Sequence, residues 1–199
     1  MREKWIRRLR PCLLLMALAV MMLAGCGGPS FRGSVLEEPV SVPDLELTDQ
    51  LGQPFQLSEQ QGQVVLLFFG YTSCPDVCPT TLATWRRIHD ALGKDAERVR
   101  FVFVTVDPER DTPARLGLHV NAFHPEFVGL TGTQGALESL YDFFAIYRER
   151  DTSSGSALGY LVNHTATTFI LDTEGRWRLR ETYGTPDEDI VHDIQQLLE

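Results

Sequence analysis

Residues Gly70–Pro79 read Gly-Tyr-Thr-Ser-Cys-Pro-Asp-Val-Cys-Pro and follow directly on the apolar run Val64–Phe69. A short, continuous apolar run that is closed by a glycine is typical of a buried strand. The residues after it then form the loop at the carboxyl end of that strand, which is where open α/β sheets handle their ligands. Cys74 and Cys78 therefore lie where a functional site is expected.

The two cysteines each precede a proline, and this constrains the local backbone. The residue before a proline avoids helical conformations, whereas proline itself suits the first helical position. We therefore predict a tight loop over 74–77 and a helix that begins at Pro79 with Cys78 as its cap. The positive end of a helix dipole favours the thiolate, which is both the nucleophile and the metal ligand. A structural disulfide or two inert buried thiols are the alternatives.

The first 25 residues are expected to be a signal peptide that is not part of the fold. Five basic residues flank the start of Cys12–Leu23, an apolar run of 12 residues that is too short to favour a membrane span. The run ends in Leu-Ala-Gly-Cys, which closely resembles a bacterial lipoprotein signal cut before Cys26, the residue that then carries the lipid. Residues 26–41 would form a lipidated tether. The alternatives are a plain secretory signal and a short anchor.

This reading places the protein outside the cytoplasm, lipid-anchored to the cell membrane and, in a Gram-negative cell, on the periplasmic face of the inner membrane. Loss of the first 25 of 199 residues leaves 174 and shifts the formal net charge from −9 to −13. Such an acidic chain argues against nucleic acid as a partner. With Cys12 removed and Cys26 lipidated, Cys74 and Cys78 are the remaining thiols, and they could serve as a disulfide, a redox couple or a soft metal site.

The rest of the chain predicts one α/β domain over 42–199. Strands and helices alternate after an N-terminal hairpin, which favours a central sheet with parallel strands and an antiparallel closing hairpin. This is the layout of the thioredoxin-like fold with an N-terminal β-hairpin and an inserted helix–strand. The predicted elements are a hairpin over 43–58, strands over 64–69, 100–106, 127–130, 166–171 and 177–183, helices over 79–92, from 113, over 135–147 and over 186–198, and an exposed loop or loose hairpin over 148–161.

One histidine is a candidate ligand. His164 lies just before the predicted strand 166–171, and in a thioredoxin-like sheet the segment entering that strand packs beside the cysteine loop. Two thiolates and an imidazole form a small, soft ligand set that suits copper, whereas a structural zinc site normally takes four protein ligands. Asp107, at the end of the strand 100–106, is expected to support the site or a partner rather than to bind metal. The other histidines are expected to be solvated or satisfied in the core, namely His89, His119, His124 and His192.

Three motifs together resemble the Sco/SenC family. They are Gly70–Pro79, Val106–Pro113 and His164 ahead of Phe169–Asp172. The resemblance covers nearly all of the chain after the tether. It implies a thioredoxin-like, copper-binding protein that helps to load the CuA centre in subunit II of cytochrome c oxidase, with that subunit and other copper-handling proteins as partners.

The resemblance also implies roles for individual residues. Cys74, Cys78 and His164 match the copper ligands, and Asp107 matches an acidic position near the site. Two positions depart from the frequent pattern: Ser73 replaces an aromatic residue or histidine, and Asn163 replaces an aspartate. Neither departure removes a ligand, but both bear on affinity or on the partner surface.

The expected mechanism links metal and redox state. Reduced Cys74 and Cys78, with His164, would hold Cu(I) or Cu(II), and oxidation to a Cys74–Cys78 disulfide would release it. The main alternative is a thiol-disulfide oxidoreductase that reduces the cysteines of the oxidase subunit without carrying metal. A peroxiredoxin-like peroxidase and a copper sensor or oxidative-stress lipoprotein are further alternatives, so enzymatic activity is left open.

Overall fold

The structure is a computed structural model that describes residues 30–44, 46–153 and 159–199 of the chain. Phe31–Glu199 form one compact unit. The predicted signal peptide over 1–25 and the lipidation site Cys26 lie outside the described residues. Within the described part of the chain, no helix has both the length and the apolar character needed to cross a bilayer.

A six-stranded sheet forms the centre of the compact unit, in the order β1-β10-β9-β4-β5-β6. Strands β4, β5 and β6 are parallel, whereas β9 pairs antiparallel with β4, and β10 and β1 continue the antiparallel half. The central strand β4 is buried along its whole length, as expected for an apolar run covered on both faces. The strands are β1 (Ser34–Ser41), β4 (Val64–Gly70), β5 (Val99–Thr105), β6 (Val128–Leu130), β9 (Thr167–Leu171) and β10 (Arg176–Thr182).

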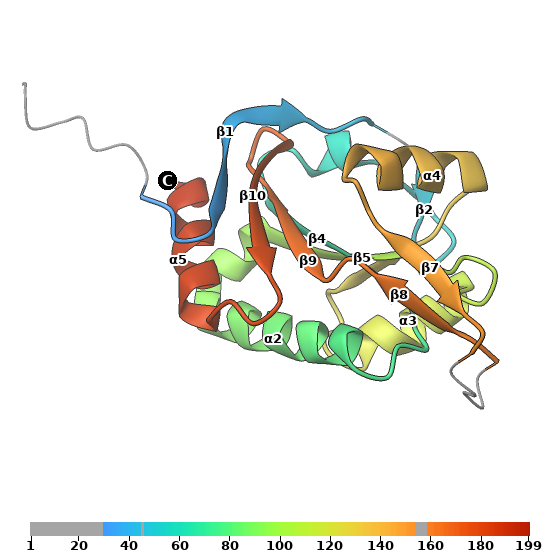
Figure 1. Ribbon diagram of the computed structural model, residues 1–199. Helices are drawn as coiled ribbons and strands as arrows, with labels where there is room; N and C mark the ends of the chain where they lie inside the picture. The colour runs from blue at the N-terminus through green and yellow to red at the C-terminus, as the bar shows by residue number, and fades with distance from the viewer. Residues whose placement is uncertain (1–29, 45, 154–158) are drawn as a thin grey trace, which may run out of the picture. The chain divides into compact units, whose positions relative to one another are not determined.

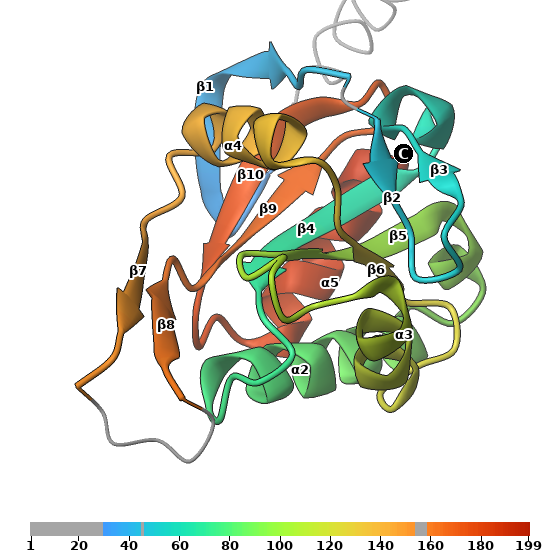
Figure 2. The same cartoon turned by 90° about the vertical axis from the view of Figure 1, so that its right-hand side faces the viewer.

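Helices cover both faces of this sheet (Figures 1 and 2). Adjacent residues of β4 point to opposite faces, so Phe68 packs edge-on against Trp85 of α2 while Phe69 packs against Tyr141 of α4 and Phe144 just after it. Helices α2 and α5 pack together on the Phe68 face. The helices are α2 (Val77–Leu92), α3 (Pro113–Asn121), α4 (Gln134–Phe143) and α5 (Asp187–Leu198), with short 3-10 helices over Leu57–Gln60 and Gly93–Arg98.

Two small hairpins lie outside the main sheet. The predicted N-terminal hairpin is present as β2 (Leu47–Thr48) and β3 (Pro54–Phe55), and a bridge between Thr48 and Thr131 joins it to the chain after β6. The segment predicted as a loop or loose hairpin over 148–161 contributes to an antiparallel pair, β7 (Arg148–Asp151) with β8 (Leu161–His164). The second hairpin matters for function because His164 is its last residue.

Some predicted boundaries are wrong, for identifiable reasons. Helix α2 begins at Val77, two residues before Pro79. A proline is tolerated anywhere in the first helical turn, because it removes only an N–H that has no helical partner there, so Pro79 does not mark the first helical position. Residues 34–41, predicted as tether, form β1, whose mostly exposed side chains give no alternating pattern. The predicted helix over 135–147 ends at Phe143, and Ala145 then takes a positive φ of 51° before β7 begins.

The closing hairpin β9–β10 is confirmed as antiparallel, but it does not form the edge of the sheet. Strand β1 pairs with β10 and covers that edge, and β9 lies against the central strand β4. The arrangement confirms an α/β, thioredoxin-like fold. It also brings the carboxyl end of β4 next to the beginning of β9, where the candidate site lies.

Candidate metal centre

The cysteine loop connects the carboxyl end of β4 to the first turn of α2. The Cys74 amide donates to the Tyr71 carbonyl at 3.1 Å, which closes a turn directly after the strand. Cys78 lies in the first helical turn rather than at the cap, and it is fully buried, whereas Cys74 is partly exposed. Both are free thiols in this structure.

Gly70 makes room for the buried sulfur. A Cβ atom at this position would lie 2.6 Å from Cys78 Sγ and 2.7 Å from the Phe103 ring, both closer than van der Waals contact allows. A side chain here would therefore push Cys78 away from β4. Glycine is needed at the end of the strand because Cys78 Sγ and the Phe103 ring come close to the backbone there, not because the residue takes a special backbone angle.

His164 lies beside the two thiols, although it follows Cys78 by 86 residues in the sequence and Cys74 by 90. Its Nε2 lies 3.4 Å from Cys78 Sγ and 4.0 Å from Cys74 Sγ, and the three ligand atoms lie within 4.8 Å of one another. The rings of Phe68 and Tyr71 contact the imidazole edge-on, with centroids 5.9 and 5.8 Å away, and so restrict its orientation. The structure thus brings together the three residues that the sequence predicts as ligands.

The tautomer of His164 follows from its other ring nitrogen. Nδ1 lies 3.0 Å from the Thr165 carbonyl oxygen, which can only accept a hydrogen bond. Nδ1 therefore carries the proton of the neutral ring, and the Nε2 lone pair faces the sulfurs. A backbone carbonyl that holds a metal-binding histidine in this way is common in metal sites, because it fixes the ring and raises its basicity.

The two thiols have opposite pKa shifts. A hydrogen bond from the Cys78 thiol lowers the pKa of Cys74 to about 4, against the opposing effect of burial. Burial, and the hydrogen bond that Cys78 gives to Cys74, raise the pKa of Cys78 well above its usual value. At neutral pH the pair therefore holds one thiolate, on the more exposed sulfur, and one thiol that donates to it.

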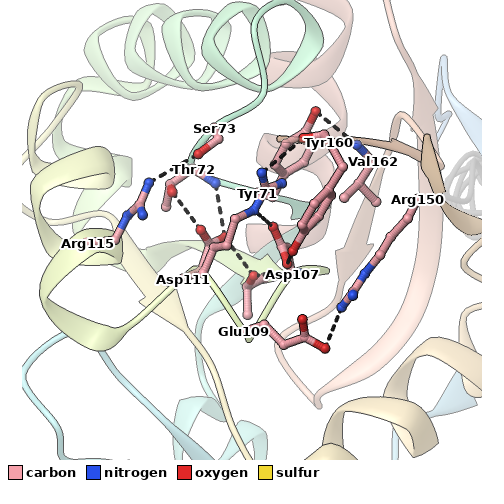
Figure 3. A network of polar contacts seen from close by, with 12 residues as sticks. Tyr71, Thr72, Ser73, Asp107, Glu109, Asp111, Arg115, Arg150, Tyr160 and Val162 are labelled. Atoms are coloured by element: carbon pink, nitrogen blue, oxygen red, sulfur yellow. Dashed lines mark hydrogen bonds and ion pairs between the residues drawn. The ribbon is translucent and has the colours of Figure 1, made fainter. Parts of the chain in front are cut away.

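Asp107 is not part of the cluster of potential ligand atoms formed by Cys74, Cys78 and His164. Its buried carboxylate forms an ion pair with Arg110 and accepts a hydrogen bond from the Tyr160 hydroxyl at 2.8 Å (Figure 3). The Arg110 guanidinium lies 3.6 Å from the centroid of the Tyr160 ring and donates to the Tyr160 carbonyl. This network fastens the start of β8 to the loop after β5, so Asp107 positions the hairpin that carries His164.

Tyr71 provides a second link between the cysteine loop and that hairpin. Its hydroxyl accepts a hydrogen bond from the backbone amide of Val162 in β8 at 3.2 Å (Figure 3). The Arg110 guanidinium also lies over the Tyr71 ring, 5.6 Å from its centroid. The loop that carries the cysteines and the strand that carries His164 are therefore joined by direct contacts, not only through the sheet.

Asp111 is a supporting residue that sequence reasoning missed. It precedes Thr112-Pro113 and is easily taken for a helix cap, but Thr112 is the cap of α3. The Asp111 carboxylate is buried and accepts hydrogen bonds from the Thr72 amide at 3.0 Å, the Thr72 hydroxyl at 2.6 Å and the Thr105 hydroxyl at 2.7 Å. It thereby clamps the cysteine loop to the end of β5. Ser73 is one of the two positions that depart from the frequent pattern of the family that the sequence resembles, and its Oγ accepts a hydrogen bond from the Arg115 guanidinium at 3.1 Å (Figure 3).

The remaining histidines divide into two kinds. His192 hydrogen-bonds to Asp193, as expected for a structural side chain, whereas His119 packs against Phe103 with a buried Nε2 that has no hydrogen-bond partner among the described residues. His89 and His124, by contrast, lie together with ring centroids 3.9 Å apart, a pairing that no sequence pattern predicts.

The geometry at Cys74, Cys78 and His164 fits a soft metal ion. Two sulfurs and a nitrogen lone pair converge, one sulfur is already a thiolate, and the potential ligands found here within the described residues are these three. Thiolates select Cu(I), and imidazole tolerates copper in either state. A set of three ligands leaves space for a further ligand to enter.

Comparisons with known proteins agree with this arrangement. The SCO1/SenC family model matches residues 36–199. A SCO2-like protein of Rickettsia felis is 36% identical over 145 residues, 72% of this chain and 71% of the relative. Apo Sco1 of Thermus thermophilus has a TM-score of 0.74 at 42% identity, covering 85% of this chain and 98% of that one. Copper-bound ScoI of Bradyrhizobium japonicum has a TM-score of 0.72 at 34% identity, covering 80% and 100%.

Proposed function

The chain belongs to the SCO1/SenC family, and we propose that it is a copper chaperone for the CuA centre of cytochrome c oxidase. The observation that carries this proposal is the convergence of Cys74, Cys78 and His164. A related structure holds copper, which supports copper as the cargo of this chain. Subunit II of the oxidase is the proposed acceptor, with other copper-handling proteins as sources of the metal.

The proposed transfer depends on ligand exchange. Cys74 supplies a preformed thiolate at the partly exposed side of the site, Cys78 supplies a second sulfur once its proton leaves, and His164 presents its Nε2 lone pair. Acceptor ligands can enter a three-ligand site and replace its members one at a time, because no fourth protein ligand from the described residues closes it. The exposed side of Cys74 is the natural point of entry.

Redox state would control whether the copper is held. When a two-electron oxidant such as a disulfide takes two electrons from the pair, Cys74 Sγ bonds to Cys78 Sγ with release of the single proton of the Cys78 thiol, and neither sulfur is then a thiolate. The disulfide leaves His164 as the only one of the three ligands, which is too little to retain the metal. Cargo binding and thiol oxidation therefore exclude each other.

Copper content in the two redox states tests this proposal. We expect the anaerobically reduced full chain to bind one copper ion more than the full chain carrying Cys74→Ser and Cys78→Ser, which retains the same other cysteines. The oxidised chain should show no such excess. Metal analysis after gel filtration gives both values. Equal copper content in the reduced and oxidised chains would refute the link, and no excess in the reduced chain would refute copper binding at this site.

The second candidate is a thiol-disulfide reductase acting on the same oxidase subunit. The low pKa of Cys74 favours it, because a partly exposed thiolate beside a buried thiol is the arrangement that attacks and then resolves a mixed disulfide. The spacing argues mildly against it, since three residues separate these cysteines where thioredoxin-type centres have two. Reduction of insulin by the metal-free chain would favour this second function.

We also propose that the chain is lipid-anchored through Cys26 on the outer side of the cell membrane. The support is the sequence motif alone: a basic start, a short apolar run and Leu-Ala-Gly-Cys at residues 23–26. A Cys26→Ser variant is expected to leave the membrane fraction of cells, whereas Cys12→Ser should remain in it. Full membrane partitioning of Cys26→Ser would exclude the lipid anchor.

A further inference from the structure

A second cluster of metal-ligating side chains lies at the other end of α2. His89 is in the last turn of that helix, 11 residues after Cys78 and so about 16 Å away along the helix axis. His124 and Glu126 come from the connection between α3 and β6. The His124 amide donates to the Val120 carbonyl at 3.1 Å, and the Phe127 amide donates to the His124 carbonyl at 3.2 Å. The backbone on this side of the cluster is therefore fixed by turns.

The two imidazoles are held close together on aromatic supports. Their ring centroids are 3.9 Å apart, His89 packs on Phe101 at 6.0 Å, and His124 packs on Phe127 at 5.3 Å. The rings cannot easily rotate away from each other. The ligand atoms of His89, His124 and Glu126 all lie within 4.8 Å of one another.

His89 faces a carboxylate with each of its ring nitrogens. Nε2 lies 3.3 Å from Glu126 Oε2, and Nδ1 lies 3.6 Å from Asp90 Oδ1. A neutral imidazole has one proton, so one nitrogen lone pair must face a carboxylate oxygen, which is repulsive unless a cation lies between them. Nδ1 is also buried and has no hydrogen-bond partner among the described residues. A metal ion bound between His89 and a facing carboxylate would remove this repulsion.

We propose that this cluster binds a divalent transition-metal ion of the Zn²⁺ or Cu²⁺ class. His89 Nε2, one ring nitrogen of His124 and the Glu126 carboxylate are the protein ligands, and water completes the set. The His89 Nδ1–H then faces the Asp90 carboxylate, whose Oδ1 lies 3.6 Å away. In a tetrahedral zinc site, neighbouring ligand atoms are about 3.3 Å apart, which is the His89–Glu126 separation.

The ligand types separate this site from the cysteine site. Imidazole and carboxylate are harder ligands than thiolate, and they suit Zn²⁺ and Cu²⁺ rather than Cu(I). The carboxylates of Asp90 and Glu126 are largely exposed, so an ion can reach them from solvent. Two other contacts oppose binding to some degree: Arg86 is a positive neighbour of His124, and His124 Nδ1 accepts a 3.3 Å hydrogen bond from the Glu126 amide.

Zinc titration of paired variants tests the proposal. Zn²⁺ is the probe because it does not oxidise thiols, and every arm is the full chain with Cys74→Ser and Cys78→Ser, so the first site cannot contribute. We expect this chain to bind one Zn²⁺ ion in competition with a chromophoric chelator. Addition of His124→Asn and Glu126→Gln should weaken that binding at least tenfold. Addition of Glu188→Gln, an exposed glutamate on α5, should leave it unchanged.

Two outcomes would overturn the proposal. If the chain with serine at both cysteine positions binds no Zn²⁺, the cluster is not a metal site. If His124→Asn with Glu126→Gln binds Zn²⁺ as tightly as its parent, the ion lies elsewhere. Cu(I) binding by the chain with both cysteines intact should be unaffected by His124→Asn and Glu126→Gln. The second site can therefore fail without affecting the proposed chaperone function, and the reverse also holds.

Discussion

Replacement of Cys78 by serine is expected to lower the affinity for Cu(I) more than about a hundredfold. Loss of a residue that only supports a metal ligand lowers metal affinity by about 10- to 100-fold, and loss of the ligand itself should cost more. Serine is close in shape to cysteine, but its hydroxyl is a hard ligand that stays protonated at neutral pH, whereas Cu(I) prefers thiolate. The same loss is expected for Cys74→Ser. His164→Ala removes the nitrogen that lies 3.4 Å from Cys78 Sγ and should also impair binding.

Competition with a chromophoric Cu(I) chelator under anaerobic conditions measures these affinities, and His192→Ala provides a matched histidine control outside the site.

Affinity for Cu(I) should rise about tenfold per pH unit between pH 7 and 8. Binding releases one proton from Cys78, whose pKa is raised, and none from Cys74, which is already a thiolate above about pH 4. Full stoichiometric binding by all three single variants would rule out this metal site.

The local part of the site could be predicted because its signals are close together in the sequence. A continuous apolar run that ends at Gly70, followed by two Cys-Pro pairs, specifies a strand, a loop and a helix start within 16 residues. The predicted helix start lies two residues too late, because proline is tolerated throughout the first turn and does not mark its first position. Chemistry that depends on one strand–loop–helix unit is accessible to sequence reasoning.

The approach of His164 depends on strand pairing between distant segments. Thr168 of β9 pairs with Phe68 of β4, so the chain just before β9 lies beyond the end of β4, beside the cysteine loop. The sequence indicates this arrangement through the expected thioredoxin-like sheet, in which the segment entering this strand packs beside the cysteine loop, and again through its likeness to a family. The hairpin β7–β8 and the Asp107–Arg110–Tyr160 network then set the position of the imidazole, and their contacts have no periodic signal in the sequence.

The features that sequence reasoning missed are those in which polar side chains from separate elements meet. Asp111 has the same sequence context whether it caps a helix or clamps the Thr72 loop, and only the fold decides between the two. His89 and His124 are 35 residues apart on different elements, so no spacing rule pairs them. Strand β1 is largely exposed and pairs only at the sheet edge, which leaves no hydrophobic alternation to detect.

Gly70→Ala is expected to destabilise the fold and to weaken copper binding together. The new Cβ would lie 2.6 Å from Cys78 Sγ and 2.7 and 2.9 Å from atoms of the Phe103 ring, all inside a fully buried strand end. Overpacking of this kind costs about 1–3 kcal/mol, or a fall in melting temperature of roughly 2–12 °C for a domain of this size. Copper affinity should fall too, because the sulfur that moves away from β4 also moves relative to His164.

Thermal unfolding and Cu(I) competition on the same samples check both effects, and Gly135→Ala is the matched control. Gly135 lies in α4 with open space where the Cβ would be, so alanine there should stabilise by about 0.5–1 kcal/mol and leave copper binding unchanged. If Cys78 Sγ is the main obstacle, Gly70→Ala should cost less in a Cys78→Ala background, because the sulfur is gone and the Phe103 contact alone remains. Unchanged melting temperature and copper affinity in Gly70→Ala would mean that Cys78 does not pack against the end of β4. The sulfur would then lack the fixed position on which the three-ligand site depends.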